Sequence, residues 1–313
     1  MAWPLIRNLP RDFHFNFVGL APYAAVVSAI LIIISGASFV TRGMNLGIDF
    51  VGGTQIEVQT KGPAQIGPLR TTIAGVGGED IQIQRLGAEN SAMLRFRPPK
   101  GTEAAAITDT VKKKLIQAFP DMQIKGVYSV GAKVSGELMR SGFLALGVAM
   151  LLMLAYIWFR FQLQFGLGAV VAVIHDVLLT LGLLSITHLE FSMTSIAALL
   201  TVIGYSMNEK VITFDRLREN LRKYKTTPLA EVINRSENER LSRTIITGST
   251  AILALSGALF MGGPLFPLVF TMVFGIVIGT YSSIYVALPI ILLWGVKRGD
   301  EDAVPLKPAN MRT

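Results

Sequence analysis

The stretch FVGLAPYAAVVSAILIIISGASFV, residues Phe17 to Val40, contains 24 consecutive residues without a charged side chain. A helix that crosses the hydrocarbon core of a bilayer needs about 20 mostly apolar residues, because each residue advances it by about 1.5 Å. The apolar core of a secretory signal peptide is only about 7–15 residues long. This run therefore predicts a membrane-spanning helix at residues 17–40 rather than a cleaved leader.

Five further stretches downstream are long and apolar enough to span a bilayer, at about residues 139–159, 165–186, 191–214, 244–261 and 268–294. Of the 313 residues, 51% are hydrophobic and 16% are charged, whereas a soluble domain carries about 25% charged residues. We therefore expect an α-helical polytopic membrane protein with six transmembrane helices, the last five forming a bundle within residues 137–294. An ordinary cytosolic enzyme is excluded.

Positive charges indicate how these segments are oriented. The stretch between the fourth and fifth segments contains eight basic residues: Arg216, Arg218, Arg222, Lys223, Lys225, Arg235, Arg240 and Arg243. The short connections at 187–190 and 262–267 contain none. Because short cytoplasmic loops carry an excess of Lys and Arg, we expect a cytoplasmic loop at 216–242. The head (1–16, partly interfacial) and the tail (295–313) are then cytoplasmic as well.

The segment 41–136 is polar and must lie on the opposite, extracytoplasmic side. Alternating apolar residues predict strands at 54–60, 80–86, 93–97 and 123–130, and periodic apolar residues predict helices at 64–74 and 102–119. The order β-α-β-β-α-β is that of a ferredoxin-like unit. We therefore expect a small α+β domain between the first and second membrane helices.

Two adjacent ionisable residues, Glu209 and Lys210, lie within the fourth segment. An ionisable group deep in a span costs at least about 2.5–3.5 kcal/mol and needs a compensating role. The long side chain of Lys210 is expected to snorkel toward the cytoplasmic surface, so we assign it no function. Glu209 has too short a side chain to do so, and it belongs to a polar stripe that includes Tyr205 and Thr213.

The hypothesis that follows is a proton site. Burial favours the protonated form of a carboxyl group and a nearby guanidinium favours the ionised form, so Arg243 at the entrance of the fifth segment would switch the proton on Glu209. The alternative is a static buried ion pair that locks the helices together. Asp176 with His175 on the third segment is either a second proton-coupling group or an interhelical hydrogen bond, and Asn208 is either part of the site or a packing contact.

Several kinds of chemistry are excluded by the sequence. The chain has no Cys, and its three His are far apart in the sequence, so neither a thiolate nor a metal motif is available. It contains no phosphate-binding loop and no nucleophile elbow. We therefore expect no enzyme activity, no cofactor and no metal. The net charge of +8 follows the membrane topology, so we expect the lipid bilayer and not nucleic acid as its charged partner.

Four motifs resemble those of a known family, the SecD/SecF translocase subunits, and the fourth segment is similar to the SecF branch. They are GIDFVGGT at 47–54, HDV at 175–177, the fourth-segment motif made of VIGYS at 202–206, NE at 208–209 and FDRLRE at 214–219, and SRT at 242–244. Within the first of these, Gly47, Asp49, Gly52 and Gly53 carry the family signature. Together with the arrangement of six spans around one outer domain, the likeness covers nearly the whole chain.

The resemblance implies a fold of the resistance-nodulation-division type in the bacterial inner membrane. It implies pairing with SecD, assistance to the SecYEG channel in exporting an emerging unfolded secretory protein, and use of the proton gradient. In the family, the carboxylate after the Asn and the Arg entering the fifth span are linked to proton passage, and these correspond to Glu209 and Arg243. The family usually has Asp where this chain has Glu209. The rival interpretations are a small-molecule or lipid exporter of the same superfamily and a passive scaffold for SecD.

Overall fold

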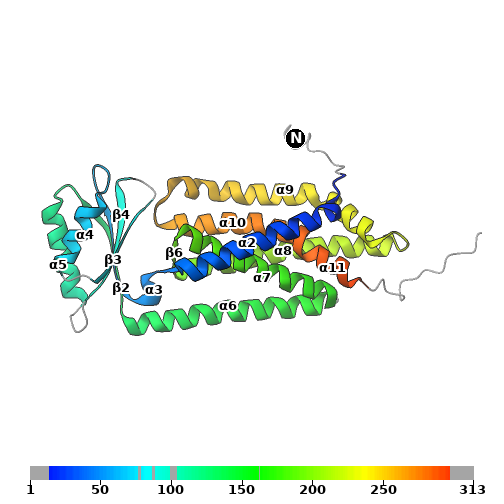
Figure 1. The fold of residues 1–313 in the computed structure, drawn as a ribbon, viewed down its shortest axis with the longest axis horizontal. Coiled ribbons are helices and arrows are strands. Elements are labelled where there is room, and N and C mark those ends of the chain that lie inside the picture. The colour runs from blue at the N-terminus through cyan, green and yellow to red at the C-terminus, as the bar shows by residue number, and fades with distance from the viewer. Residues whose placement is uncertain (1–13, 77–78, 87–88, 99–103, 162, 297–313) are drawn as a thin grey trace, which may run out of the picture.

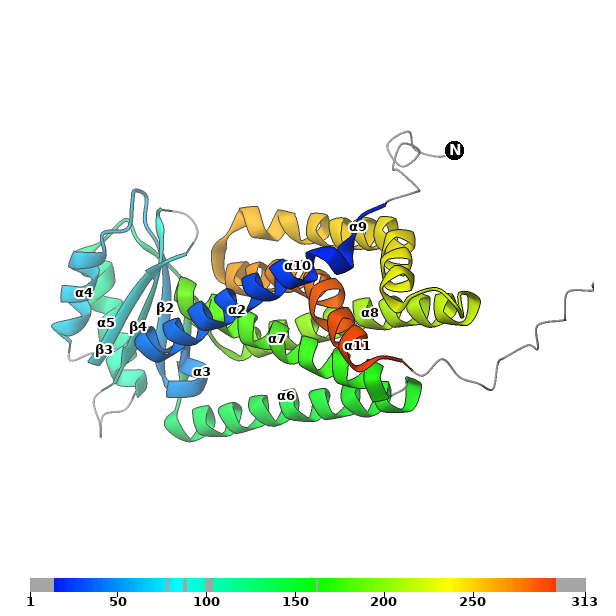
Figure 2. The ribbon, with the colours of Figure 1, turned by 45° about the vertical axis from the view of Figure 1, so that its right-hand side comes forward.

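The computed structural model describes residues 14–76, 79–86, 89–98, 104–161 and 163–296. A bundle of long helices lies at one end of the molecule, and a small domain with a sheet and two helices lies at the other (Figures 1 and 2). The expected tail from residue 297, most of the expected head and the expected helix start at Thr102 fall outside the described residues.

The bundle consists of helices contributed by nearly the whole second half of the chain and by one helix that precedes the small domain. They are α2 (Phe17–Arg42), α6 (Ala132–Arg160), α7 (Leu163–Thr187), α8 (Met193–Lys223), α9 (Leu229–Met261), α10 (Phe266–Ser282) and α11 (Leu288–Trp294). Within the described residues, five helical stretches are long and apolar enough to cross a membrane: α2, α6, α7, α9 and the stretch from α10 to α11.

The predicted fourth span corresponds to α8, which is as long as the others but is not one of these five apolar stretches. The polar residues on one face of α8 point inward, because Ser206, Glu209, Lys210 and Thr213 are all buried. Figure 1 shows α8 inside the bundle, with α9 and α10 on one side and α7 on the other. A central position removes the need for an apolar surface all round, since the polar face meets other helices rather than lipid.

The expected cytoplasmic loop at 216–242 is mostly helical, which corrects that prediction. Only residues 224–228 separate the end of α8 from the start of α9. Both helices continue past the membrane segments because each keeps a buried apolar side, formed by Leu217 and Leu221 on α8 and by Val232 and Ile233 on α9.

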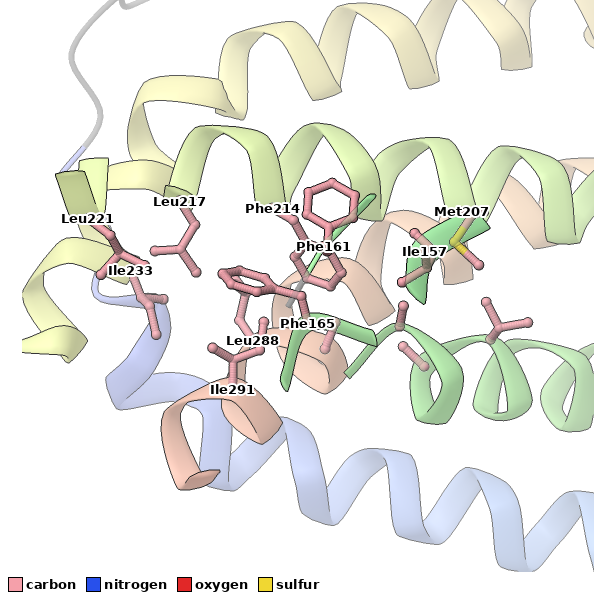
Figure 3. Packing of buried hydrophobic residues seen from close by; sticks show 14 of the residues in the cluster. Ile157, Phe161, Phe165, Met207, Phe214, Leu217, Leu221, Ile233, Leu288 and Ile291 are labelled. Atoms are coloured by element: carbon pink, nitrogen blue, oxygen red, sulfur yellow. The ribbon is translucent and has the colours of Figure 1, made fainter. Parts of the chain in front are cut away.

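A cluster of buried aliphatic and aromatic side chains fills the bundle on the side of this helical connection (Figure 3). At its centre, Phe161, Phe165 and Phe214 form an aromatic triangle with ring centroids 5.2–6.0 Å apart. Tilted and edge-to-face aromatic pairs at such distances add about 0.5–1.5 kcal/mol each to the energy of apolar burial. The triangle fixes the turn between α6 and α7 against α8.

The predicted span at 268–294 is not one uniform helix. A π-helical segment, η2 (Ser283–Ala287), lies between α10 and α11. Such wide turns are rare and frequently occur at functional sites. Ser282, the last residue of α10, and Ser283, the first residue of η2, place their hydroxyl groups in the centre of the bundle, where both bind charged groups described below.

The small domain contains β2 (Gly53–Gln59), α4 (Ile66–Ala74), β3 (Glu79–Arg85), β4 (Ser91–Arg97), α5 (Ala104–Ala118) and β5 (Gln123–Val130). The strands form one antiparallel sheet in the order β3-β4-β2-β5. Helices α4 and α5 cover the face turned away from the bundle (Figure 1). The element order is that expected from the sequence, and the core lies between the helices and this face of the sheet.

Two short elements that the sequence analysis did not predict join this domain to the bundle. Strand β1 (Asn45–Leu46) pairs in parallel with β6 (Glu190–Phe191), which lies between α7 and α8, and the short helix α3 (Ile48–Val51) follows β1. The Asp49 carboxylate accepts a hydrogen bond of 2.9 Å from the backbone N–H of Met193, the first residue of α8. A carboxylate there satisfies a free helix N–H and complements the helix dipole.

The signature glycines surround this junction. Gly53 has φ of +127°, and a Cβ atom there would lie 2.9 Å from the Phe96 carbonyl oxygen. A Cβ at Gly47 would clash with the Glu190 carboxylate. The glycines thus let the chain leave the membrane helix and enter the sheet at close range.

Candidate functional site

The centre of the bundle contains a triad of buried charged side chains, Glu209 on α8 and Glu237 and Arg240 on α9. The Arg240 guanidinium contacts Glu237 through Nε, 2.9 Å from each carboxylate oxygen, and through Nη2 at 2.7 Å. Its Nη1 lies 3.1 Å from Glu209 Oε2. Both carboxylates have side chains 1% exposed, so this interaction is screened very little by water.

Two hydroxyl groups complete the coordination of the triad. Arg240 Nη1 donates to Thr244 Oγ1 at 2.6 Å, and Thr244 Oγ1 donates to Glu209 Oε2 at 3.2 Å. Arg240 Nη2 donates to Ser283 Oγ at 3.0 Å. The helix geometry explains the grouping, because Glu237, Arg240 and Thr244 are three and four residues apart and therefore share one face of α9.

A second buried ion pair lies beside the triad and joins α7 to α8. Lys210 Nζ is 2.9 Å from Asp176 Oδ2, and both side chains are 0% exposed. Ser206 and Ser282 hydroxyl groups bind both ions, donating to Asp176 and accepting from Lys210. His175 Nδ1 lies 3.0 Å from Asp176 Oδ1, and its Nε2 lies 3.2 Å from Ser28 Oγ on α2.

The expectation that Lys210 snorkels to the surface is wrong. Its ammonium group is fully enclosed because Asp176 supplies the opposite charge and two serines supply acceptors. An ionised group stays in such an interior only when it is paired and hydrogen-bonded. The expected interhelical contact of Asp176 is present, and its partner on α8 is Lys210.

The expected pairing of Glu209 with Arg243 is also wrong for this structure. Arg240 holds the carboxylate, whereas Arg243 is exposed. The two arginines are three residues apart on α9, so their side chains point in directions that differ by about 60°. Only the direction of Arg240 coincides with the face that packs against α8 and η2. Asn208, proposed as part of the site, is exposed as well.

Of the predicted site residues, the structure places Glu209 in the triad and Asp176 in the neighbouring ion pair. The sequence did not predict their partners, which are Arg240 and Glu237 in the triad and Lys210, Ser206 and Ser282 in the pair. Glu237 and Arg240 have helical spacing in the sequence. That spacing does not indicate a shared helix face in a stretch expected to be a loop. Within the described residues, Tyr205, one turn before Glu209 on α8, has the only fully buried side-chain oxygen without a hydrogen-bond partner.

No group of three or more His, Cys, Asp or Glu side chains that could hold a metal ion occurs in the part of the chain that the structure describes. The charged centre instead consists of carboxylates paired with amino and guanidinium groups. Such an arrangement is suited to binding and releasing protons, since a carboxyl group changes charge when its ionic partner moves.

Comparison with known proteins identifies the chain. The family model described as protein export membrane protein SecD/SecF, C-terminal, matches residues 110–297, and the SecD/SecF GG motif matches residues 37–64. The chain belongs to the SecD/SecF family. The SecD/SecF match covers both charged clusters, and the GG-motif match covers the junction with its signature glycines.

Relatives similar over nearly the full length carry the SecF name. The protein translocase subunit SecF of Cereibacter sphaeroides is 42% identical over 94% of both chains. The SecF subunit of Desulfurispirillum indicum is 39% identical over 91% of this chain and 93% of its own. Similarity at this coverage gives this member of the SecD/SecF family the role of a SecF subunit in protein translocation.

Solved structures show the same fold. The crystal structure of SecDF from Thermus, a translocon-associated membrane protein, matches with a TM-score of 0.83 and 31% identity over 94% of this chain. SecDF in its super-membrane-facing form matches with a TM-score of 0.65 and 32% identity over 90% of this chain. The present chain spans about two fifths of each of those SecDF chains.

Proposed function

We propose that this chain couples proton flow across the cytoplasmic membrane to protein export, as the SecF part of a SecDF complex of the resistance-nodulation-division type. The observation that carries the proposal is the Glu209 carboxyl group, 1% exposed and held by Arg240 and Thr244 midway along the central helix α8. Ionisable residues inside a membrane bundle are rare and costly, and proton relays are one of the roles that they mark.

The proposed topology has six spans, with α8 as the fourth, both termini in the cytoplasm and the α+β domain, of ferredoxin-like order, outside. Eight Lys and Arg between residues 216 and 243 support a cytoplasmic location of the helical connection from α8 to α9. The two connections at the other end, 187–190 and 262–267, have none. The bacterial inner membrane is the compartment that this arrangement fits.

A movement caused by protonation of Glu209 would be transmitted to the outer domain through α8. Uptake of a proton neutralises the carboxylate and weakens its contact with Arg240, which lets α8 and α9 move relative to each other. The other end of α8 is bonded to Asp49, and β6 just before it is paired with β1. A charge that crosses the membrane potential supplies about 2.3 kcal/mol per 100 mV, enough to shift an equilibrium between two conformations.

The partners that this role requires are SecD, the SecYEG channel and the emerging unfolded secretory protein. Unpaired helix faces are available for a membrane partner, because only 17% of the apolar window of α2, 11% of that of α6 and 6% of that of α9 is buried. An enzymatic reaction, a cofactor and a metal have no part in this mechanism.

The experiment that tests it is Glu209→Gln in cells depleted of the native protein. Export of a secreted precursor and copurification of SecD are scored together, and Glu219→Gln, an exposed position on the same helix, is the control. We expect export to fall to the level of depleted cells while the complex stays assembled. Normal export with Glu209→Gln would leave the passive scaffold as the function, and absence of any copurifying SecD would favour an independent exporter.

A further inference from the structure

One guanidinium group, that of Arg240, contacts two buried carboxyl groups in this bundle. The side chains of Arg240, Glu209 and Glu237 are each no more than 3% exposed. When all three are ionised, the triad has two negative charges and one positive charge, and therefore a net charge of −1. The neighbouring pair of Asp176 and Lys210 is balanced by itself and has no charge to spare.

Other titratable groups around the triad do not restore the balance. Tyr205 on α8 and Tyr285 on η2 face the triad and can only add negative charge. His175 on α7 is the remaining group that can become positive, and it contacts Asp176 and Ser28 rather than either glutamate of the triad. An uncompensated charge in an interior of low dielectric constant is costly, and two carboxylates that share a site do not both ionise readily.

The contacts of Arg240 with the two carboxylates are unequal. Glu237 is held by two bonds of 2.9 Å and one contact of 2.7 Å, whereas Glu209 has a single contact of 3.1 Å. Short, multiple contacts are typical of a guanidinium with an ionised carboxylate. Glu209 is therefore the more weakly held of the two carboxyl groups.

We propose that Glu237 is a second member of the proton site: it competes with Glu209 for Arg240, so that the triad binds one proton, held on Glu209 in this structure. This deepens the proposed function, on which it rests for the use of that proton in export. On uptake, a proton from water binds a Glu209 carboxylate oxygen and Arg240 stays with Glu237. On release, the proton returns to water and Arg240 must divide its donors between two carboxylates.

The role assigned to Glu237 is that of a positioning residue, because it acts on Glu209 through Arg240. Without Glu237, Arg240 would pair with Glu209 alone and hold that carboxylate in its ionised form. The proton site would then be lost although Glu209 itself were still present. This consequence distinguishes the proposal from a merely structural ion pair.

The test counts protonated carboxyl groups in the purified full-length chain in lipid vesicles by infrared spectroscopy at pH 7. The chain is labelled with ¹³C-glutamate, so that the carbonyl stretch of a protonated Glu is separated from that of Asp. Exposed glutamates are ionised at this pH. Glu190 is subtracted with the variant Glu190→Gln, because burial raises the pKa of that carboxyl group in the extracytoplasmic part.

We expect a band equivalent to one carboxyl group in the wild type, and its loss in both Glu209→Gln and Glu237→Gln. Glu237→Asp keeps the charge and should keep the band. Arg240→Gln should double the band, because both carboxyl groups are then protonated. A wild type without the band, with His175 carrying the balancing charge, would overturn the proposal even if no variant folds. A band that persists in Glu237→Gln would overturn it as well.

The same measurement separates this proposal from the proposed function, since it needs no export. If the band follows the expected pattern while Glu209→Gln exports normally, the shared proton is correct and the coupling is not. If Glu209→Gln stops export while the band in Glu237→Gln equals that of the wild type, coupling stands and Glu237 has no part in it.

Discussion

Lys210 and Asp176 are both buried in the bundle, and each is the charge that allows the other to stay ionised. Their side chains are 0% exposed, and Ser206 and Ser282 bind both of them. Breaking a buried pair leaves one uncompensated charge, which costs about 3–5 kcal/mol, whereas replacing both ions by neutral groups is often tolerated.

We therefore predict that Asp176→Asn lowers the stability of the full chain by about 3–5 kcal/mol. The double variant Asp176→Asn/Lys210→Met should recover most of the loss, because no charge is then left in the interior. Thermal unfolding in detergent measures both. If the double variant loses as much stability as Asp176→Asn and Lys210→Met lose together, the two charges do not stabilise each other.

Among elements, the entrance of the chain into the small domain depends on glycine at one position more than at others. Gly53 begins β2 with φ of +127°, a conformation that residues with a side chain rarely adopt, and a Cβ would approach the Phe96 carbonyl oxygen to 2.9 Å. Strained backbone of this kind costs about 1–3 kcal/mol. Gly136 inside helix α6, which follows β5, has no atom within 4 Å of the position of a Cβ.

The two glycines form a matched comparison. We expect Gly53→Ala to destabilise the chain by about 1–3 kcal/mol. Gly136→Ala should instead stabilise it by about 0.5–1 kcal/mol, since Ala is favoured over Gly within a helix. Unfolding midpoints of the two variants give the answer, and equal effects of the two substitutions would contradict the role of the Gly53 backbone conformation.

For the molecule as a whole, the contact that matters is the one between the small domain and the bundle. Arg95 on β4 is buried there, donating to the Leu46 carbonyl oxygen at 2.7 Å and to Asn45 Oδ1 at 2.8 Å, with Glu190 on β6 at 3.7 Å. Burial raises the pKa of the Glu190 carboxyl group, an effect that Arg95 opposes and Asp49 enhances. Burial also lowers the pKa of Arg95.

A raised pKa in the folded state means that the folded protein binds a proton that the unfolded chain has already lost. The stability from Glu190 is therefore complete below its ordinary pKa and disappears as the pH rises through the raised value. We predict that mild acid stabilises the wild type relative to Glu190→Gln, which is neutral at every pH. The readout is the unfolding midpoint against pH, with exposed Glu89→Gln as control. An unchanged pH profile in Glu190→Gln would refute this.

The local sequence patterns predicted most of the elements. The strands of the sheet and its two helices are found within one or two residues of the expected positions, because period-two and period-3.6 patterns report which faces are buried. The helical continuation of α8 and α9 was missed because a dense run of positive charges was interpreted as a loop. The strands β1 and β6 have two residues each and leave no periodic pattern.

Long apolar helices, a polar α+β segment after the first of them, Glu209 in the fourth predicted span and the SecD/SecF signature can each be predicted from the sequence, since each is a property of one contiguous stretch. The partners of the buried charges are known from the three-dimensional arrangement alone. Arg240 rather than Arg243 meets Glu209, and Lys210 meets Asp176 instead of the membrane surface. The physical reason is that a pairing between helices depends on their rotation and depth, to which neighbouring turns and a π-helical segment contribute, and no single stretch of sequence contains that information.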